Sequence, residues 1–290
     1  MMPAAALKDL RRTRPEWGPW LAVVEAIVQE AAAPLWDAAA AAAQVSQPAA
    51  PLLAGATVAV DTNSVGRLLN RLIRIAARTR APKMATLEAA LHGDVETLPL
   101  FKASLRQDRD TLVELAAACG ADAEAFQAVA GLLPVPFLHA FTRRWAPSIS
   151  KSWVEGYCPV CAAWPAFAEV RGIERSRYFR CGRCGGEWHA RALRCPYCDT
   201  SDHDQLAALV PENGGSNATI DACLHCHGYV KTLTRLQGCP PDRVMIEDLA
   251  SVDLDVAALE HGYARPAGVG QSLEITVTGS GATRRFFAWS

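Results

Sequence analysis

Four short cysteine motifs decide how this sequence is organised. They are Cys158-Pro-Val-Cys161, Cys181-Gly-Arg-Cys184, Cys195-Pro-Tyr-Cys198 and Cys223-Leu-His-Cys226, and the intervals between them hold 19, 10 and 24 residues. A CxxC turn directs two thiolates at one ion, so two such turns complete a tetrahedral metal site. The pattern therefore predicts two four-cysteine sites, whose ligands are Cys158, Cys161, Cys181, Cys184, Cys195, Cys198, Cys223 and Cys226.

Two pairings of the four turns are compatible with the sequence. In the sequential pairing the first turn joins the second and the third joins the fourth, because the first interval has the length typical of a four-cysteine ribbon. In the nested pairing the second turn joins the third across the 10-residue interval, and the first joins the fourth. We expect the sequential pairing, because the nested one requires the outer turns to meet over a long loop.

The ligands indicate a metal ion without selecting it. Thiolates suit zinc or iron, so the expected cofactors are two metal ions, iron or zinc. Four thiolates around a divalent ion leave a net charge of about −2, and the arginines of this region can offset that charge. They are Arg171, Arg175, Arg177, Arg180, Arg183, Arg191 and Arg194. The same arginines can instead form a basic patch for an acidic partner or nucleic acid.

Other cysteines and histidines are weaker ligand candidates. Cys119 lies on the apolar side of a predicted helix and is expected in the core, and Cys239 is expected to be a spare thiol. Each histidine near the turns can replace a cysteine, but four thiolates per site are already available. These histidines are His189, His203, His225 and His227.

The first 150 residues differ from the cysteine region, because they are rich in Ala and Leu. Apolar residues at helical spacing predict helices around residues 17–28, 65–76, 105–116, 126–133 and 137–145. Thr13 and Glu16 form a capping-box pattern before the first helix, and Asp61 offers a cap for the second. The second helix also carries an arginine stripe that is either a solvated face or a cationic surface for an acidic partner. Its members are Arg67, Arg71, Arg74 and Arg78.

The second half has short runs of strand-type residues between turn signals, at 167–170, 177–181, 207–210, 218–222 and 229–234. The fold class that we expect is α+β: an α-helical N-terminal domain followed by tandem rubredoxin-like or zinc-ribbon metal-binding modules. The expected boundaries are 1–150 for the helical domain, 151–194 and 195–266 for the two modules, and 267–290 for a tail. The second module includes a C-terminal helix.

Composition and motifs exclude several classes of protein. The net charge of −1 gives no global field that would recruit nucleic acid or a membrane. No signal-peptide pattern opens the chain, and we expect a cytoplasmic protein with no membrane insertion. A phosphate-binding loop, a dinucleotide fingerprint, a nucleophile elbow and an HExxH motif are all absent from the sequence. We therefore expect no enzyme and no catalytic residues.

Longer strings around the turns resemble the formate dehydrogenase accessory protein FdhE family. The strings lie between residues 155 and 266. They include Tyr178-Phe-Arg-Cys181-Gly-Arg-Cys184-Gly-Gly-Glu-Trp-His189, Arg194-Cys195-Pro-Tyr-Cys198, Gly228-Tyr-Val-Lys231, Glu247-Asp-Leu-Ala-Ser251, Leu254-Asp255 and Gly262-Tyr-Ala-Arg265. Two substitutions depart from the family pattern: Ala162 occupies a position where Gly often follows the first turn, and His227 replaces Gly after the fourth. The tail from Ala267 to Ser290 is also longer than the resemblance leads us to expect.

The resemblance implies a cytoplasmic, chaperone-like maturation factor that binds metal, with iron a rival to zinc, through rubredoxin-like folds. It also implies that the partner is the catalytic subunit of a respiratory formate dehydrogenase, which needs the factor to become active. The eight turn cysteines carry over as metal ligands. Homo-oligomers are possible, and nucleic acid is not an expected partner. Two alternatives stay open: a zinc-ribbon nucleic-acid-binding protein, which requires salt-dependent affinity, and a thiol–disulfide oxidoreductase, which requires an exposed cysteine of low pKa.

Overall fold

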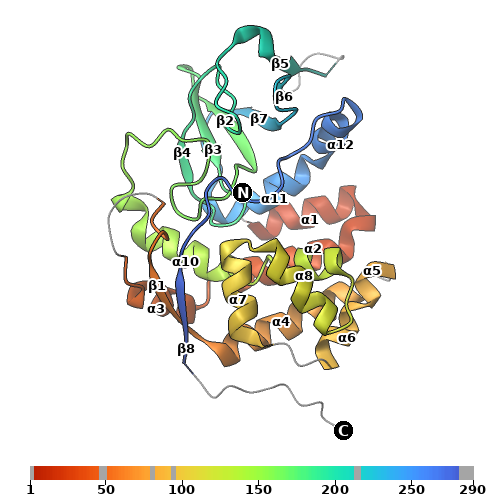
Figure 1. The fold of residues 1–290 in the computed structure, drawn as a ribbon. Coiled ribbons are helices and arrows are strands. Elements are labelled where there is room, and N and C mark those ends of the chain that lie inside the picture. The colour runs from red at the N-terminus through yellow and green to blue at the C-terminus, as the bar shows by residue number, and fades with distance from the viewer. Residues whose placement is uncertain (1–2, 46–50, 79–81, 93–95, 212–216, 281–290) are drawn as a thin grey trace. The chain divides into compact units, whose positions relative to one another are not determined.

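The computed structural model describes residues 3–45, 51–78, 82–92, 96–211 and 217–280, and the chain divides into two compact units (Figure 1). The first unit comprises Met1–Gln47, Leu53–Arg144 and Leu273–Ser290, and the second comprises Pro48–Leu52 and Trp145–Ser272. The first is mainly helical and the second contains a sheet, so the predicted α+β class is confirmed. Residues 281–290, the end of the predicted tail, and residues 212–216 lie outside the described residues.

The first unit is built from helices. In chain order they are α1 (Pro3–Thr13), α2 (Gly18–Glu30), α3 (Pro34–Ala42), α4 (Thr62–Ala77), α5 (Pro82–Ala85), α6 (Leu87–His92), α7 (Thr97–Arg106), α8 (Arg109–Ala118), α9 (Ala123–Ala130) and α10 (Val135–Trp145). The predicted stripe on α4 is buried, including Val65, Leu69 and Leu72. Asp61 caps this helix as predicted, because its carboxylate accepts hydrogen bonds from the backbone N–H groups of Asn63 and Ser64.

Two helix predictions were wrong in detail. Thr13 ends α1 instead of capping the next helix, and its hydroxyl donates to the Asp9 and Leu10 carbonyls. The single helix predicted around 105–116 is two helices, because Gln107 adopts a left-handed conformation (φ 58°) after α7. Asp108 then caps α8 through the backbone N–H of Thr111.

Two strands of the first unit come from distant parts of the chain. Strands β1 (Thr57–Asp61) and β8 (Thr276–Ser280) pair in parallel, with Thr57 opposite Thr276 (Figure 1). Neither strand was predicted from the sequence, and β8 lies within the expected tail. Through this pairing, residues 276–280 belong to the helical unit.

The second unit contains a six-stranded sheet in the order β4-β3-β2-β7-β6-β5. The strands are β2 (Phe167–Arg171), β3 (Ser176–Arg180), β4 (Glu187–His189), β5 (Leu206–Leu209), β6 (Ala218–Cys223) and β7 (Tyr229–Arg235). All five predicted strands are present within about one residue, and β4 is additional. The central strands β2 and β7 are parallel, whereas the other neighbours are antiparallel. One sheet thus joins the strands of both cysteine regions.

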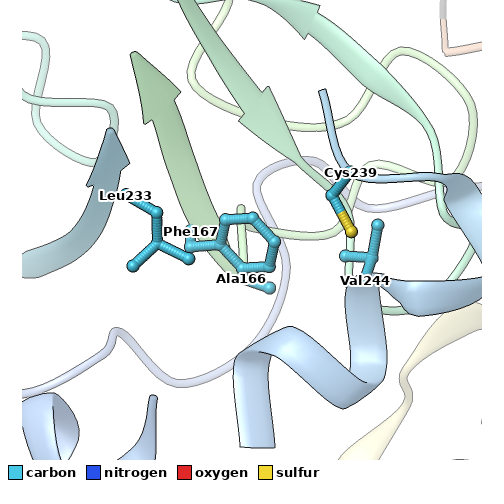
Figure 2. Close-up of a cluster of buried hydrophobic side chains, with 5 residues drawn as sticks. All are labelled: Ala166, Phe167, Leu233, Cys239 and Val244. Atoms are coloured by element: carbon cyan, nitrogen blue, oxygen red, sulfur yellow. The ribbon is translucent and has the colours of Figure 1, made fainter. Parts of the chain in front are cut away.

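Helices α11 (Val244–Ala250) and α12 (Val252–Glu260) cover one face of this sheet. Figure 2 shows Phe167 and Leu233 of adjacent strands together with Val244 of α11. Cys239 is buried in the same cluster, so the expected spare thiol is a core residue. Successive residues of a strand face opposite sides of the sheet. The residues of β2 and β7 that neighbour Phe167 and Leu233 in the chain therefore face away from α11 and α12.

Among the residues that the structure describes, one apolar helical stretch meets the length and composition needed to cross a membrane, Ala123–Ser148. It contains α9 and α10, which are separated by a turn, and 78% of its most apolar window is buried inside the protein. This burial is typical of helices in the core of a globular unit. Cys119, directly after α8, is buried as predicted.

Candidate metal centres

The four cysteine turns share one backbone form. In each turn the first cysteine's N–H donates to the carbonyl five residues ahead: Ala163, Gly186, Thr200 and Gly228, at 2.9, 3.0, 3.0 and 2.9 Å. The residue after the second cysteine has a positive φ in every turn. These residues are Ala162 (55°), Gly185 (70°), Asp199 (63°) and His227 (54°). This repeated conformation brings both sulfurs of a turn to the same side.

The two departures from the family pattern, Ala162 and His227, fall at these left-handed positions. Glycine adopts a positive φ without cost, whereas a residue with a Cβ is strained there, by roughly 1–2 kcal/mol. Histidine tolerates the conformation better than most residues. The departures therefore change the backbone energy of two turns while leaving every cysteine in place.

The first centre consists of Cys158, Cys161, Cys181 and Cys184, whose sulfurs all lie within 4.8 Å of one another. Cys158 Sγ is 3.5 Å from Cys184 Sγ, and Cys161 Sγ is 3.5 Å from Cys181 Sγ. A tetrahedron of metal–sulfur bonds of about 2.3 Å would separate its sulfurs by about 3.8 Å. All four residues are fully buried, at 0% exposure. The arrangement can hold one tetrahedral metal ion.

The second centre consists of Cys195, Cys198, Cys223 and Cys226, again within 4.8 Å of one another. The Cys195–Cys226 and Cys198–Cys223 sulfur distances are 3.6 and 3.7 Å. Cys195 and Cys223 are buried, whereas Cys198 and Cys226 are half-buried. The cysteines thus group as the sequential pairing predicts, and the two groups can each hold a metal ion.

Local hydrogen bonds suit thiolates at the first centre. The backbone N–H groups of Val160 and Cys184 donate to the sulfurs of Cys158 and Cys181, at 3.4 and 3.5 Å. Burial raises the pKa of the Cys158 thiol well above its ordinary value, because an unpaired charge is disfavoured in the interior. Hydrogen bonds from the other three thiols lower the pKa of Cys161. A metal ion would supply the positive charge that four buried thiolates require.

The histidine candidates lie outside both groups: within the described parts of the chain, each four-ligand group contains cysteines alone. His189 lies on β4, where its ring is 4.5 Å from that of Tyr178 and its neighbour Trp188 is buried. The ring of His227 lies 6.3 Å from that of Tyr263. Both histidines therefore pack against aromatic rings.

Most of the arginines proposed to offset the thiolates bind carboxylates instead. Arg180 is 1% exposed and contacts Glu169, which is 0% exposed, and also Glu187, both at 3.2 Å. Arg171 binds the same two carboxylates, and Arg177 lies 2.6 Å from Asp221. The buried Glu169 was not predicted from the sequence. Strand alternation is the signal that could have found it. Glu169 lies two residues from Phe167 and from Arg171, so all three side chains belong to the face of β2 that meets the helices.

A second buried ion network joins the strings that carried the family resemblance. The ammonium of Lys231, 0% exposed, lies 2.6 Å from Asp248 and 2.8 Å from Asp255. Arg265 binds the same two carboxylates, both at 2.8 Å. Tyr229 donates to Asp255 at 2.6 Å, and Tyr197 of the third turn donates to the Tyr229 carbonyl at 2.8 Å. The network thus connects α11 and α12 to the second centre.

The comparisons with known proteins agree with this architecture. No family model matches the chain. The FdhE homologue of Stutzerimonas stutzeri is 34% identical over 113 residues, which cover 38% of this chain and 36% of that protein. Protein FdhE of Escherichia coli (strain K12) is 32% identical over 111 residues, which cover 38% of this chain and 35% of that protein. The match thus spans about a third of each relative's length.

A solved structure extends the similarity beyond that segment. The crystal structure of the FdhE protein from Pseudomonas aeruginosa has a TM-score of 0.54 and 21% sequence identity, and the match covers 92% of both chains. At this identity the match establishes the fold. The resemblance to the FdhE family is therefore confirmed: the chain shares a segment of FdhE sequence and, over most of its length, the FdhE fold.

Proposed function

We propose that this protein is a cytoplasmic FdhE-type accessory factor, not an enzyme, that assists the assembly or activation of a respiratory formate dehydrogenase. The observation that carries the proposal is the pair of cysteine-only groups within the FdhE fold. Closed sites with four thiolates have no open coordination position, so a metal held there supports structure or binding more readily than hydrolysis. The partner that this proposal names is the catalytic subunit of the dehydrogenase.

The eight turn cysteines are the metal ligands in this proposal, one ion per centre. Either zinc or iron fits a set of four thiolates. Elemental analysis of anaerobically purified protein is expected to give two metal ions per chain. Visible absorption distinguishes the metals, because iron–thiolate centres are coloured and zinc centres are not. A metal content below one ion per chain after reconstitution would contradict the proposed ligand set.

The accessory role is tested in a strain that lacks the protein. Such a strain is expected to make the dehydrogenase polypeptide and to have little formate-dependent electron transfer. The wild-type gene should restore activity, and Cys158→Ser and Cys195→Ser should not. Cys119→Ser is the matched control, because this buried thiol lies outside both centres. Normal formate oxidation in the deletion strain would exclude the role.

Thiol–disulfide exchange is the less favoured function. A reactive CxxC cysteine of the thioredoxin type lies at a helix N-terminus, which stabilises its thiolate. None of the four turns opens a helix in the described structure, since each is a turn or bend next to a strand or loop. The first centre's sulfurs are also fully buried, which denies access to a disulfide substrate.

A further inference from the structure

The second unit contains a cavity of about 570 Å³ on the sheet face opposite α11 and α12. Its floor includes Val170 of β2 with Val230 and Thr232 of β7, and the loop at 192–197 forms a wall. Volumes of this size are typical of binding pockets. Cys195 and Cys223 of the second centre border the cavity, whereas none of the first centre's cysteines does.

Three arginines from two segments line this cavity: Arg175 and Arg177 of the β2–β3 hairpin, and Arg194. The carboxylate among its lining residues is Asp221, which binds Arg177 and also accepts a hydrogen bond from Thr232. The Nε of Arg177 is buried and has no hydrogen-bond partner among the described residues. A buried donor without a partner costs about 1–3 kcal/mol, so a ligand acceptor would be favoured beside it.

The rim of the cavity presents an apolar side chain to solvent. Leu193 lines the cavity and is 63% exposed. Both Leu193 (φ 51°) and Arg175 (φ 53°) have left-handed backbone conformations. For residues with bulky side chains such strain is uncommon, and it concentrates at functional sites. Exposed apolar anchors beside arginines are characteristic of protein-binding surfaces.

The edge of the sheet next to the cavity can receive a strand. Strand β5 contributes Leu206, Ala207 and Ala208 to the lining and pairs on one side with β6. It is the last strand of the sheet in the described structure, so its outer backbone groups can bond an added extended segment.

We propose that this cavity is the docking site for an extended, acidic segment of a partner polypeptide. One part of the segment pairs with β5 at the sheet edge. The part that continues across the cavity presents its carboxylates to Arg175 and Arg177 and an apolar side chain to Leu193. This inference rests on the proposed function, which names the catalytic subunit of formate dehydrogenase as the partner. The arginine stripe on α4 is a weaker candidate, because Arg71 already donates to Gln29 at 2.9 Å and Arg67 to Ser64 at 2.7 Å.

The test measures binding of the purified catalytic subunit to the metal-loaded full chain. Arg175→Asp and Leu193→Asn suit the positive φ, since Asp and Asn tolerate it, and each is expected to raise Kd at least tenfold. Arg191→Asp is the matched control, because Arg191 is exposed in the adjoining loop but does not line the cavity. It makes the same charge change and should alter Kd less than twofold.

Hydrogen exchange separates the possible outcomes. Binding of the subunit is expected to protect the amides of residues 206–209 in the wild-type protein. Binding that protects other segments, with an unchanged Kd for Arg175→Asp and Leu193→Asn, would overturn the docking site and leave the accessory function intact. No binding by the metal-loaded wild type would overturn both. Protection of the cavity by inorganic phosphate, with no effect of the variants on the subunit, would assign the cavity to a small anion and also overturn the proposal.

Discussion

The two metal centres have the same local backbone but different surroundings. At the first centre all four cysteines are fully buried, whereas at the second Cys198 and Cys226 are half-buried. Distant segments explain part of this difference. The N–H of Leu52 donates to Pro159 at 2.8 Å and that of Gly270 donates to Ala162 at 2.9 Å, so both cover the first turn. The second centre instead borders the cavity. Identical turns thus acquire different accessibility from the chain packed around them.

Removal of one ligand from each centre gives the largest expected effects. Because metal binding and folding are coupled, with about 10–16 kcal/mol for structural zinc in small peptides, Cys158→Ser and Cys195→Ser should each lose one metal ion of two. Each should unfold mainly the region around its own centre. Metal analysis and hydrogen exchange measure both effects. If Cys181→Ser and Cys195→Ser each remove the same metal ion, the sequential grouping is wrong.

The buried ion networks predict the next largest effects. Arg180→Met removes one of the cations around Glu169, which keeps Arg171 and Arg235, and removes a 3.1 Å hydrogen bond to Gly185 in a turn of the first centre. Lys231→Met removes one of the two cations that bind Asp248 and Asp255 beside the second centre and leaves Arg265 as the other. Each is expected to reduce the free energy of unfolding by about 1.5–3 kcal/mol, because charged hydrogen bonds are lost inside the protein while the carboxylates keep another cation.

Denaturant unfolding with metal analysis checks that prediction and its assignment to each centre. Arg180→Met should weaken the first metal more, and Lys231→Met the second. The control is Arg12→Met, which removes an exposed pair with Asp9 and should cost less than about 1 kcal/mol. Equal metal loss from both centres in either variant would mean that the sheet unfolds as one cooperative body.

Metal release should expose the difference in burial directly. Because the surroundings of a site control solvent access, a chelator should remove metal from the second centre faster, by roughly tenfold, or ~1.4 kcal/mol in activation free energy. Cys158→Ser retains only the second centre and Cys195→Ser only the first, so the two release rates can be measured separately. Slower release from the second centre would show that burial does not set the rate.

The smallest expected effect concerns the left-handed residue of a turn. Ala162→Gly should leave the free energy of unfolding unchanged or raise it by up to ~1 kcal/mol, since relief of strain is partly offset by the entropy of glycine in the unfolded chain. Ala162→Val should lower it, because a β-branched residue is poorly tolerated at φ 55°. The matched substitutions His227→Gly and His227→Val test the same position in the second centre by denaturant unfolding.

Local patterns predicted the elements that depend on neighbouring residues. The helical stripe on α4, its Asp61 cap and the five predicted strands needed only periodicity and turn residues. Where two local signals competed, prediction was less accurate: Thr13 had a cap-like sequence context but lies at a helix end. The strand pair β1–β8 could not be predicted, because it joins residues that are 219 positions apart in register.

The sequence by itself determined the candidate ligands, eight cysteines in four CxxC turns, and favoured the sequential grouping over the nested one without fixing it. Only the tertiary structure decided how accessible each set is and what lies around it. The packing of segments decides which residues are buried, as Glu169 and Lys231 are. It also decides which arginines form buried ion pairs, which line the cavity and which face of the sheet stays open. Such packing is set by contacts between residues far apart in the chain, and local periodicity carries no information about those contacts.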